Sequence, residues 1–280
     1  MKLRITFFSI LALAFIIHAC DKIESPYRIA TSGNIIDTGN TVKKVILIEE
    51  FTGQRCPNCP EMAVAIKEIS NSYPEQLVVV AIHAGFFAMP LGTTFSTDYR
   101  TPAGNELDQF FSIGSAGYPK GLVNRSGFSS GTFRLESDEL AGRVVEELDG
   151  DPVLDIKISN VYSTGSRIAD IVVDVNVMAQ MQRELLFSVF ITEDSLVSPQ
   201  QDKTEVIHDY VHRHILRAAV NGTWGEPLNE GSVLSPGTTF SKTLQQTLGS
   251  NWNDEHCHIV AFVYDDETKE VLQAAEVKIR

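Results

Sequence analysis

Runs of apolar residues predict that strands and helices alternate in the first half of the chain. Residues 42–48, which end in the apolar run 45–48, are expected to form the first buried strand. Residues 77–82 are apolar almost without a break, which is typical of a strand covered on both faces. Between them, residues 58–72 carry apolar side chains at helical spacing. The order strand, helix, strand indicates a layered α/β arrangement.

The same pattern continues to about residue 148. Residues 85–103 are irregular and partly aromatic, and they are expected to form an insertion that could serve as a lid or a partner groove. A short helix is predicted at residues 105–111 and a strand at 120–124. A helix over residues 137–148 has Ser137 as its expected N-cap, because serine accepts a hydrogen bond from a free backbone N–H in the first turn.

The pattern changes after the turn at residues 149–152, and strands dominate from there on. Several of them alternate apolar and polar residues with a period of two, as half-exposed strands do. The expected strands are residues 153–161, 168–177, 185–192, 239–245, 257–264 and 271–279. This number of strands in about 130 residues predicts an antiparallel β-sandwich over residues 151–280.

The start of the chain reads as an export signal. Residues 5–17 form an apolar run that is shorter than the roughly 20 residues needed to span a bilayer. We therefore expect residues 1–19 to be a signal peptide. Cys20 follows in a lipobox-like setting, although His18 is unusual there, and its acylation would anchor the protein to a membrane surface. A plain signal peptide remains the alternative, and residues 20–41 read as a tether.

Charge narrows the classes of partner. Removal of the signal peptide takes away Lys2 and Arg4, which changes the formal charge of −13 to −15. Nucleic acids and anionic lipid surfaces attract clustered cations. The acidic composition therefore argues against a nucleic-acid partner.

The most specific chemical motif is Cys56-Pro-Asn-Cys59, which follows a predicted strand and opens a predicted helix. In that context two thiols separated by two residues read as a redox pair rather than half of a zinc site. A helix N-terminus and the neighbouring Arg55 would stabilise a thiolate at Cys56, so Cys56 is the expected nucleophile and Cys59 the resolving thiol. A permanent structural Cys56–Cys59 disulfide is the alternative.

Other candidate residues are weaker. Cys257 lies between two histidines in a predicted strand, and alternation would turn it to the opposite face as a buried free thiol. His208, His212 and His214 form a histidine cluster that reads as a polar surface segment, with metal binding as the alternative. His83, at the end of a strand, reads as structural, although it could approach the cysteine pair. No metal and no dissociable cofactor is expected.

Residues 42–148 resemble the thioredoxin superfamily, through the strand, the cysteine motif at a helix start and the Gly-Tyr-Pro sequence some sixty residues later. The resemblance implies that the Tyr118–Pro119 bond is cis and lies against the two sulfurs. It also implies that the Tyr118 backbone pairs with an extended substrate. Glu50 stands where thioredoxins bury an acid, which would relay protons to Cys59; a surface glutamate is the alternative.

The whole chain also resembles a narrower family, the Bacteroidetes outer-membrane lipoproteins related to a 28-kDa outer-membrane protein. The segments that carry this resemblance are residues 49–53, 210–217, 261–264 and 270–275. It implies an α/β thioredoxin-like domain followed by an all-β, Ig-like antiparallel sandwich, on a lipoprotein of the cell envelope. It does not supply a substrate.

Together these observations predict a lipid-anchored outer-membrane protein that exchanges thiols and disulfides with protein substrates and with an envelope redox partner. A rival hypothesis is a non-catalytic envelope protein, in which the thioredoxin-like part is a scaffold and the β domain binds a partner or a glycan. A third is a metal-handling protein that uses the histidine cluster. The direction of electron flow stays open, because Arg55 stands where thioredoxins commonly carry tryptophan.

Overall fold

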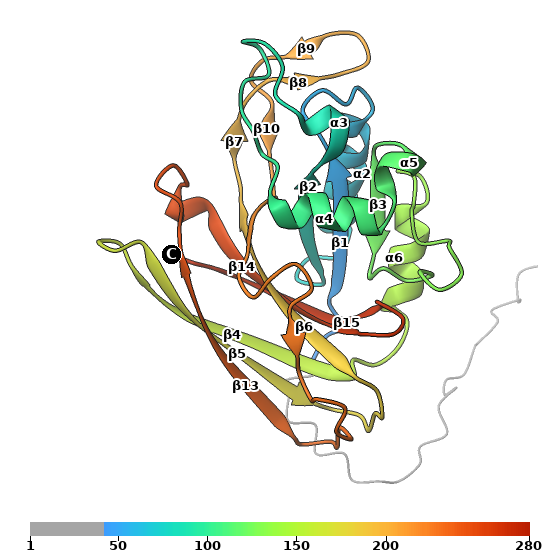
Figure 1. Cartoon of the computed structure of the whole chain (residues 1–280). Coiled ribbons are helices and arrows are strands. Elements are labelled where there is room, and N and C mark those ends of the chain that lie inside the picture. The colour runs from blue at the N-terminus through green and yellow to red at the C-terminus, as the bar shows by residue number, and fades with distance from the viewer. Residues whose placement is uncertain (1–41) are drawn as a thin grey trace, which may run out of the picture. The chain divides into compact units, whose positions relative to one another are not determined.

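The computed structural model describes residues 42–280, which contain helices and strands in mixed order (Figure 1). Cys20 and the expected signal peptide and tether lie outside the described residues. The helices are α2 (Cys59–Ser72), α3 (Gly85–Ala88), α4 (Pro102–Phe110), α5 (Ile113–Ala116), α6 (Leu140–Leu148) and the 3-10 helix η1 (Asp254–His256). Among the described helices, none is both long and apolar enough to cross a membrane.

The strands fall into one large sheet and three small ones. The strands of the first half are β1 (Ile46–Thr52), β2 (Leu77–His83) and β3 (Lys120–Val123). Those of the second half are β4 (Leu154–Ser163), β5 (Ile168–Val177), β6 (Leu185–Glu193), β7 (Leu196–Val197), β8 (Gln200–Gln201), β9 (Val206–Ile207), β10 (Val211–His212), β11 (Ile215–Ala219), β12 (Glu226–Pro227), β13 (Thr239–Thr247), β14 (Cys257–Asp265) and β15 (Val271–Lys278).

The first half builds the α/β arrangement that the apolar runs predict. β1 pairs in parallel with β2 and antiparallel with β3. Every residue of β1 is buried, because α2 and α6 pack on one face of the sheet and a second core covers the other. Helix α2 begins at Cys59 with Asn58 as N-cap and Pro60 in its first turn, where the missing N–H of proline removes no hydrogen bond.

The second half of the chain shares the large sheet with the first half. β6, β14 and β15 join β2 through β11, so that the large sheet runs β15-β14-β6-β11-β2-β1-β3. The link is short: Ile215 pairs with Ala81, and the Ala81 N–H donates to the His214 carbonyl at 2.8 Å. The first half leaves the edge of β2 open, and an open buried edge needs partners for its backbone groups. Residues 42–280 accordingly form one compact unit.

A three-stranded antiparallel sheet, β13-β5-β4, covers one face of β6, β14 and β15. The side chains between these layers are aliphatic and almost fully buried, and they include Val173, Val189 and Ile259. The free thiol of Cys257 lies in this core, as the alternation of the strand predicted. This layer therefore packs as two facing sheets, one of which also belongs to the α/β part (Figure 1).

Two local predictions need correction. Ser137 does not cap α6, which begins at Leu140 with Glu139 as N-cap and no side-chain cap; residues 137–139 form a turn before the helix. The histidine cluster does not form a wholly exposed polar segment; the chain there is extended at β9 and β10. His212 is also buried, at 4% exposure, because its segment folds back over β2 rather than lying on the surface.

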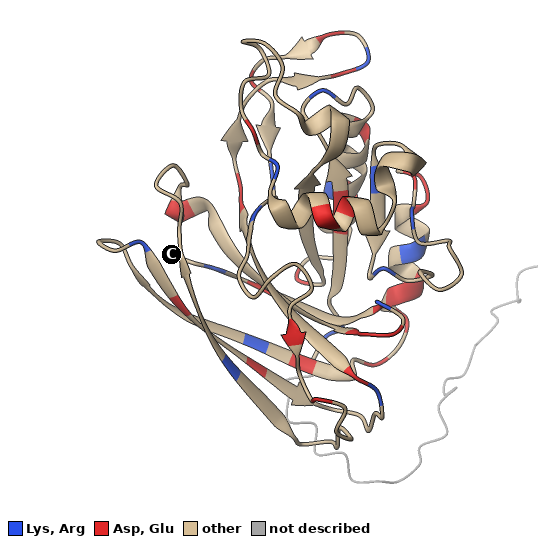
Figure 2. Cartoon of the chain, viewed as in Figure 1, with Lys and Arg blue, Asp and Glu red and all other residues tan. Residues whose placement is uncertain are grey.

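Charged side chains are distributed over many elements. Figure 2 shows acidic residues on α4 and both signs of charge on α6 and among the strands, rather than one sign gathered on one element. One pair is exceptional, because it lies inside the molecule: Arg125 binds Glu49 through two hydrogen bonds of 2.7 Å, and each side chain is 1% exposed. This ion pair joins β1 to the turn after β3.

Candidate functional site

Cys56 and Cys59 form a disulfide where β1 leads into α2. Their Cα atoms lie 5.4 Å apart. The turn between strand and helix is closed by backbone hydrogen bonds, from the Cys56 N–H to the Gly53 carbonyl at 3.0 Å and from the Cys59 N–H to the Cys56 carbonyl at 3.3 Å. The pairing predicted from the spacing of the two residues is present.

The disulfide is not at the surface. Cys56 has no exposed area and Cys59 is 2% exposed, whereas a nucleophile that attacks protein substrates needs an accessible sulfur. The guanidinium of Arg55 is also engaged elsewhere: it lies 4.6 Å from the centroid of the Phe86 ring and donates to the Phe86 carbonyl. In this conformation, therefore, Cys56 is covered, and the cation expected beside it is bound to α3.

The cover is a segment between β6 and β11, residues 194–214, which we call the arm. Gln200 of the arm donates through Nε2 to the carbonyl oxygens of Cys56 at 3.0 Å and Gly53 at 3.3 Å. The Gln201 N–H donates to the Gln54 carbonyl at 2.7 Å. These contacts place the β8–β9 hairpin over the turn that carries the disulfide (Figure 1).

Tyr118 and Pro119 lie on another side of the same turn, and the peptide bond between them is cis. Together with Asn58 of the cysteine motif they line a hollow of about 410 Å³. The Tyr118 hydroxyl donates to Asp108 of α4, and burial raises the pKa of this tyrosine. The side chain of Tyr118 is thereby fixed, while the hollow itself is mostly polar and is bordered by Lys203 of the arm.

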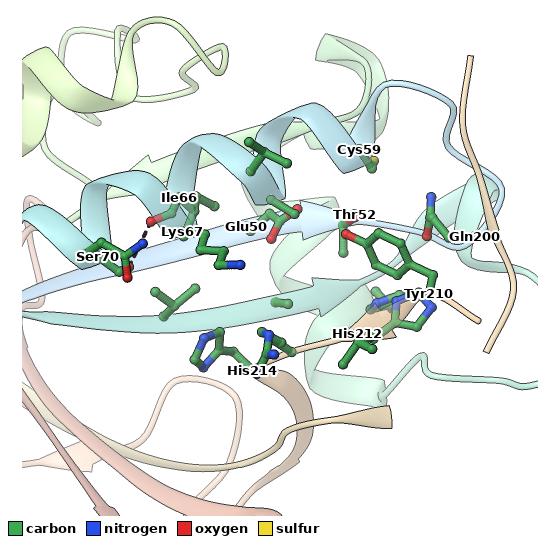
Figure 3. A pocket seen from close by; sticks show the side chains of 18 residues that line it. Glu50, Thr52, Cys59, Ile66, Lys67, Ser70, Gln200, Tyr210, His212 and His214 are labelled. Atoms are coloured by element: carbon green, nitrogen blue, oxygen red, sulfur yellow. Dashed lines mark hydrogen bonds between the residues drawn. The ribbon is translucent and has the colours of Figure 1, made fainter. Parts of the chain in front are cut away.

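A larger pocket of about 610 Å³ lies between α2, the strands β1 and β2, and β10 of the arm. Figure 3 shows it with Cys59 and Gln200 at one end, Ser70 at the other, and Glu50, Tyr210 and Lys67 between them. Cys59 lines this pocket, and Cys56 is absent from its walls. Cys59 thus borders a cavity, although both cysteines of the disulfide are buried.

Glu50 is buried in the wall of this pocket, at 6% exposure. Burial raises its pKa from 4.5 to about 7, with a smaller opposing effect from a hydrogen bond with Thr52. Tyr210 faces Glu50 across the pocket (Figure 3), and burial together with the charge of Glu50 raises its pKa to about 12. A carboxyl group that titrates near neutral pH is suited to move protons.

Three histidines also line the pocket, but they do not gather around one point. Burial lowers the pKa of His83 well below its usual value and that of His212 to about 4, so both are neutral at pH 7. Their rings pack against each other and against Tyr99, with centroids 5.1 to 5.5 Å apart. Residues 42–280 contain no group of three or more His, Cys, Asp or Glu side chains arranged to hold a metal ion. The third histidine is His214, whereas His208 is not part of the wall.

The free thiol of Cys257 takes no part in this site. It lies in the core between the facing sheets, and burial raises its pKa to about 12. A thiol that stays protonated at neutral pH is a poor nucleophile.

Sequence reasoning missed the arm. Gln200 gives no signal by itself, because a glutamine in a polar segment is most simply a surface residue. Residues 210–217 did stand out as part of the family resemblance, and residues 210–214 among them line the pocket. The contacts of Gln200 with Gly53 and Cys56 join positions 147 and 144 apart in the chain, which local periodicity does not reveal.

Gly53 holds the turn close to α3, and this contact gives a test of the local packing. A Cβ atom at Gly53 would lie 2.5 Å from the Phe87 carbonyl carbon and 2.6 Å from the Ala88 nitrogen. We expect Gly53→Ala to lower the free energy of unfolding by about 1–3 kcal/mol, because backbone atoms must move apart. Urea unfolding measures the change.

The control is Gly142→Ala in α6, where nothing lies within 4 Å of the added Cβ atom; it should instead stabilise the protein by up to about 1 kcal/mol. Equal changes in the free energy of unfolding for Gly53→Ala and Gly142→Ala would contradict the tight contact at Gly53.

Comparison with solved structures finds matches among bacterial proteins, and the first of these has a similar fold. HBP35 of Porphyromonas gingivalis matches with a TM-score of 0.66 and 17% identity, over 85% of this chain and 76% of that chain. A protein from Agrobacterium tumefaciens matches with a TM-score of 0.49 and 13% identity, over 86% and 96% of the two chains. A domain of the outer membrane lipoprotein Omp28 from Porphyromonas gingivalis matches with a TM-score of 0.30 and 25% identity, over 46% and 89%.

No curated protein matches the chain. The family model described as outer membrane protein Omp28 matches residues 108–280, more than half of the sequence, and the matched region begins after the disulfide. The chain therefore belongs to the outer membrane protein Omp28 family, and it is an outer-membrane protein of the cell envelope.

Proposed function

We propose that the protein exchanges thiols and disulfides with protein substrates in the cell envelope through Cys56 and Cys59, and that a lipid on Cys20 anchors it to the outer membrane. The observation that carries this proposal is that Glu50 and Cys59 line one pocket. A buried carboxyl group that lines the same pocket as one cysteine of a pair at a helix start is an arrangement that thiol exchange can use and that a mere structural link does not need.

The fold supports the same proposal. A parallel strand–helix–strand unit, an antiparallel third strand and a following helix are what a thioredoxin-like part requires, and β1, α2, β2, β3 and α6 supply them in this order. The two facing sheets of the second half support an Ig-like layer, which here shares β6 and β14 with the large sheet.

The proposed chemistry begins with the reduced pair. The Cys56 thiolate attacks a substrate disulfide, which forms a mixed disulfide and releases one substrate thiolate. Cys59 then loses its proton to Glu50 and attacks Cys56, which releases the second substrate thiolate and restores the Cys56–Cys59 disulfide. Cys56 has no exposed area, so a protein substrate gains access only when the arm, held by Gln200 and Gln201, moves away.

One observation favours a second function. The complete burial of Cys56 under Gln200 suits a permanent disulfide in a scaffold, with binding assigned to the β layer. An exchange assay separates the two functions.

The assay uses the reduced protein with insulin as a disulfide substrate. We expect the wild type to reduce insulin, Cys56→Ser to lose at least 100-fold in rate, and Cys59→Ser to accumulate a mixed disulfide with an insulin chain on non-reducing gels. The physical reason is that Cys59 resolves the intermediate. Cys257→Ser, which removes the buried core thiol, is the matched control and should keep the wild-type rate. Insulin reduction no faster than by free cysteine would support the scaffold.

A further inference from the structure

The pocket gives Cys59 a route to solvent whose mouth lies away from the arm hairpin. Val64 and Lys67 of α2 and Val211 and Arg213 around β10 line the pocket and are exposed, so its mouth opens between this helix and this strand. Its inner end meets Cys59, whereas Cys56 does not line it. The two sulfurs therefore differ in access although they belong to one disulfide.

We propose that this pocket is the entry site of a low-molecular-weight thiol, which attacks the disulfide at Cys59 and thereby reduces the pair from inside. This inference rests on the proposed exchange function and names the class of reductant that restores the dithiol.

The direction from which a thiolate attacks a disulfide supports the assignment of this pocket as the entry site. A thiolate attacks a disulfide sulfur from the side opposite the leaving sulfur, and the rate depends on access to that sulfur. Because Cys59 lines the pocket and Cys56 does not, a thiol inside it meets Cys59 and makes Cys56 the leaving sulfur. Cys56 then leaves just before the N-terminus of the 14-residue helix α2, where backbone N–H groups favour a thiolate.

Size and polarity of the pocket also fit a small molecule. A volume of about 610 Å³ lies within the range of small-molecule sites, roughly 300–1,000 Å³. Its interior offers hydrogen-bonding groups without partners, since the Nδ1 atom of His83 and the Nε2 atom of His212 are buried and have none among the described residues. Buried polar groups are normally paired with protein, water or ligand. A polar thiol can supply such partners.

The reaction balances in two steps. The incoming thiol R–SH gives its proton to the Glu50 carboxylate, and R–S⁻ bonds to the Cys59 sulfur while the Cys59–Cys56 bond breaks and Cys56 leaves as a thiolate. A second thiol gives up its proton, attacks the R sulfur of the mixed disulfide and releases R–S–S–R and the Cys59 thiolate. Each sulfur of the protein gains one electron, the two small thiols lose one each, and the two protons return to the cysteines.

The test measures how fast 2-mercaptoethanol reduces the oxidised full chain, by acid quench, unfolding, alkylation and mass spectrometry. Val64→Trp at the mouth and Ala63→Phe on the wall should each slow reduction at least tenfold by filling the route. Val145→Trp, at an equally exposed position on α6 outside the pocket, is the matched control and should change the rate less than twofold. Gln201→Ala loosens the hairpin by removing side-chain hydrogen bonds to the Asp202 and Glu205 carbonyls, leaves the pocket walls intact, and should also have less than a twofold effect. The early adduct should be on Cys59.

Two results would overturn the proposal. One is that Val64→Trp folds normally yet is reduced at the wild-type rate. The other is that Gln201→Ala accelerates reduction tenfold with the adduct on Cys56, which would mean that the thiol enters under the hairpin. Neither readout uses a protein substrate, so the two proposals can fail separately. A wild type that fails to reduce insulin would refute the exchange function and leave the entry route supported. A wild type that reduces insulin, with Val64→Trp reduced by 2-mercaptoethanol at the wild-type rate, would refute the entry route and leave the exchange function supported.

Discussion

Replacing Arg125 by Met should lower the free energy of unfolding by about 3–5 kcal/mol, the largest single effect that we expect in this molecule. Glu49 would then remain charged in the core with no cation beside it. The Arg125 guanidinium also lies 5.1 to 5.3 Å from the ring centroids of Phe111, Phe262 and Tyr264, so the substitution removes cation–π contacts as well. Urea unfolding of the oxidised protein at pH 7 measures the loss.

The control and the decisive comparison come from two further variants. Arg280→Met removes a half-exposed arginine that pairs with Asp254 at 3.5 Å, and this should cost less than about 1 kcal/mol. The double variant Glu49→Leu/Arg125→Met should be less destabilised than Arg125→Met alone, because no unpaired charge stays buried. If the double variant loses the sum of both single effects, charge burial is not the cause.

The second large effect concerns pH. Glu50→Gln should stabilise the protein by roughly 3 kcal/mol at pH 8 and have little effect at pH 4, since one pKa unit corresponds to about 1.4 kcal/mol. In the folded protein burial raises the pKa of Glu50 from 4.5 to about 7. Between these two values the unfolded chain ionises Glu50 while the folded chain keeps it protonated. The folded state then binds more protons, so its stability falls as pH rises through this window.

Unfolding in urea at pH 4 and pH 8 tests this prediction. Burial also raises the pKa of Glu276 to about 7, but Glu276 is present in both proteins and its effect cancels in the comparison. Glu68→Gln, on the exposed face of α2, is the matched control and should change stability equally at both pH values. A stabilisation by Glu50→Gln that is the same at pH 4 and pH 8 would show that Glu50 titrates normally.

The carboxyl groups of Glu49 and Glu50 have opposite effects on stability although they are neighbours in β1. Glu49 points to the core that contains Arg125, and Glu50 points to the pocket, because side chains of a strand alternate between its faces. A destabilising Glu50 is expected at a functional site, where activity is often retained at a cost in stability. The stability measurement on Glu50→Gln is therefore also indirect support for the exchange chemistry.

Local patterns predicted much of the first half of the molecule. The apolar runs gave β1 and β2, and helical spacing gave α2 with its start at the cysteine motif, because each of these elements buries side chains at a regular period. The same reasoning failed at the start of α6, where Ser137 lies in a turn and Glu139 precedes the helix. N-cap preference is a weak signal, and the packing of Leu140 against β3 decides where the helix begins.

Sequence by itself determined that two cysteines at a helix start would pair and that Cys257 would be a buried thiol, since both follow from spacing and alternation within a few residues. Tertiary structure alone decided that Gln200 covers Cys56, that Arg125 neutralises Glu49 and that β11 joins the second half to β2. These contacts join residues that lie about 75 to 150 positions apart. Their energy comes from burying charge and backbone groups against distant partners, and no local period in the chain encodes which partners those are.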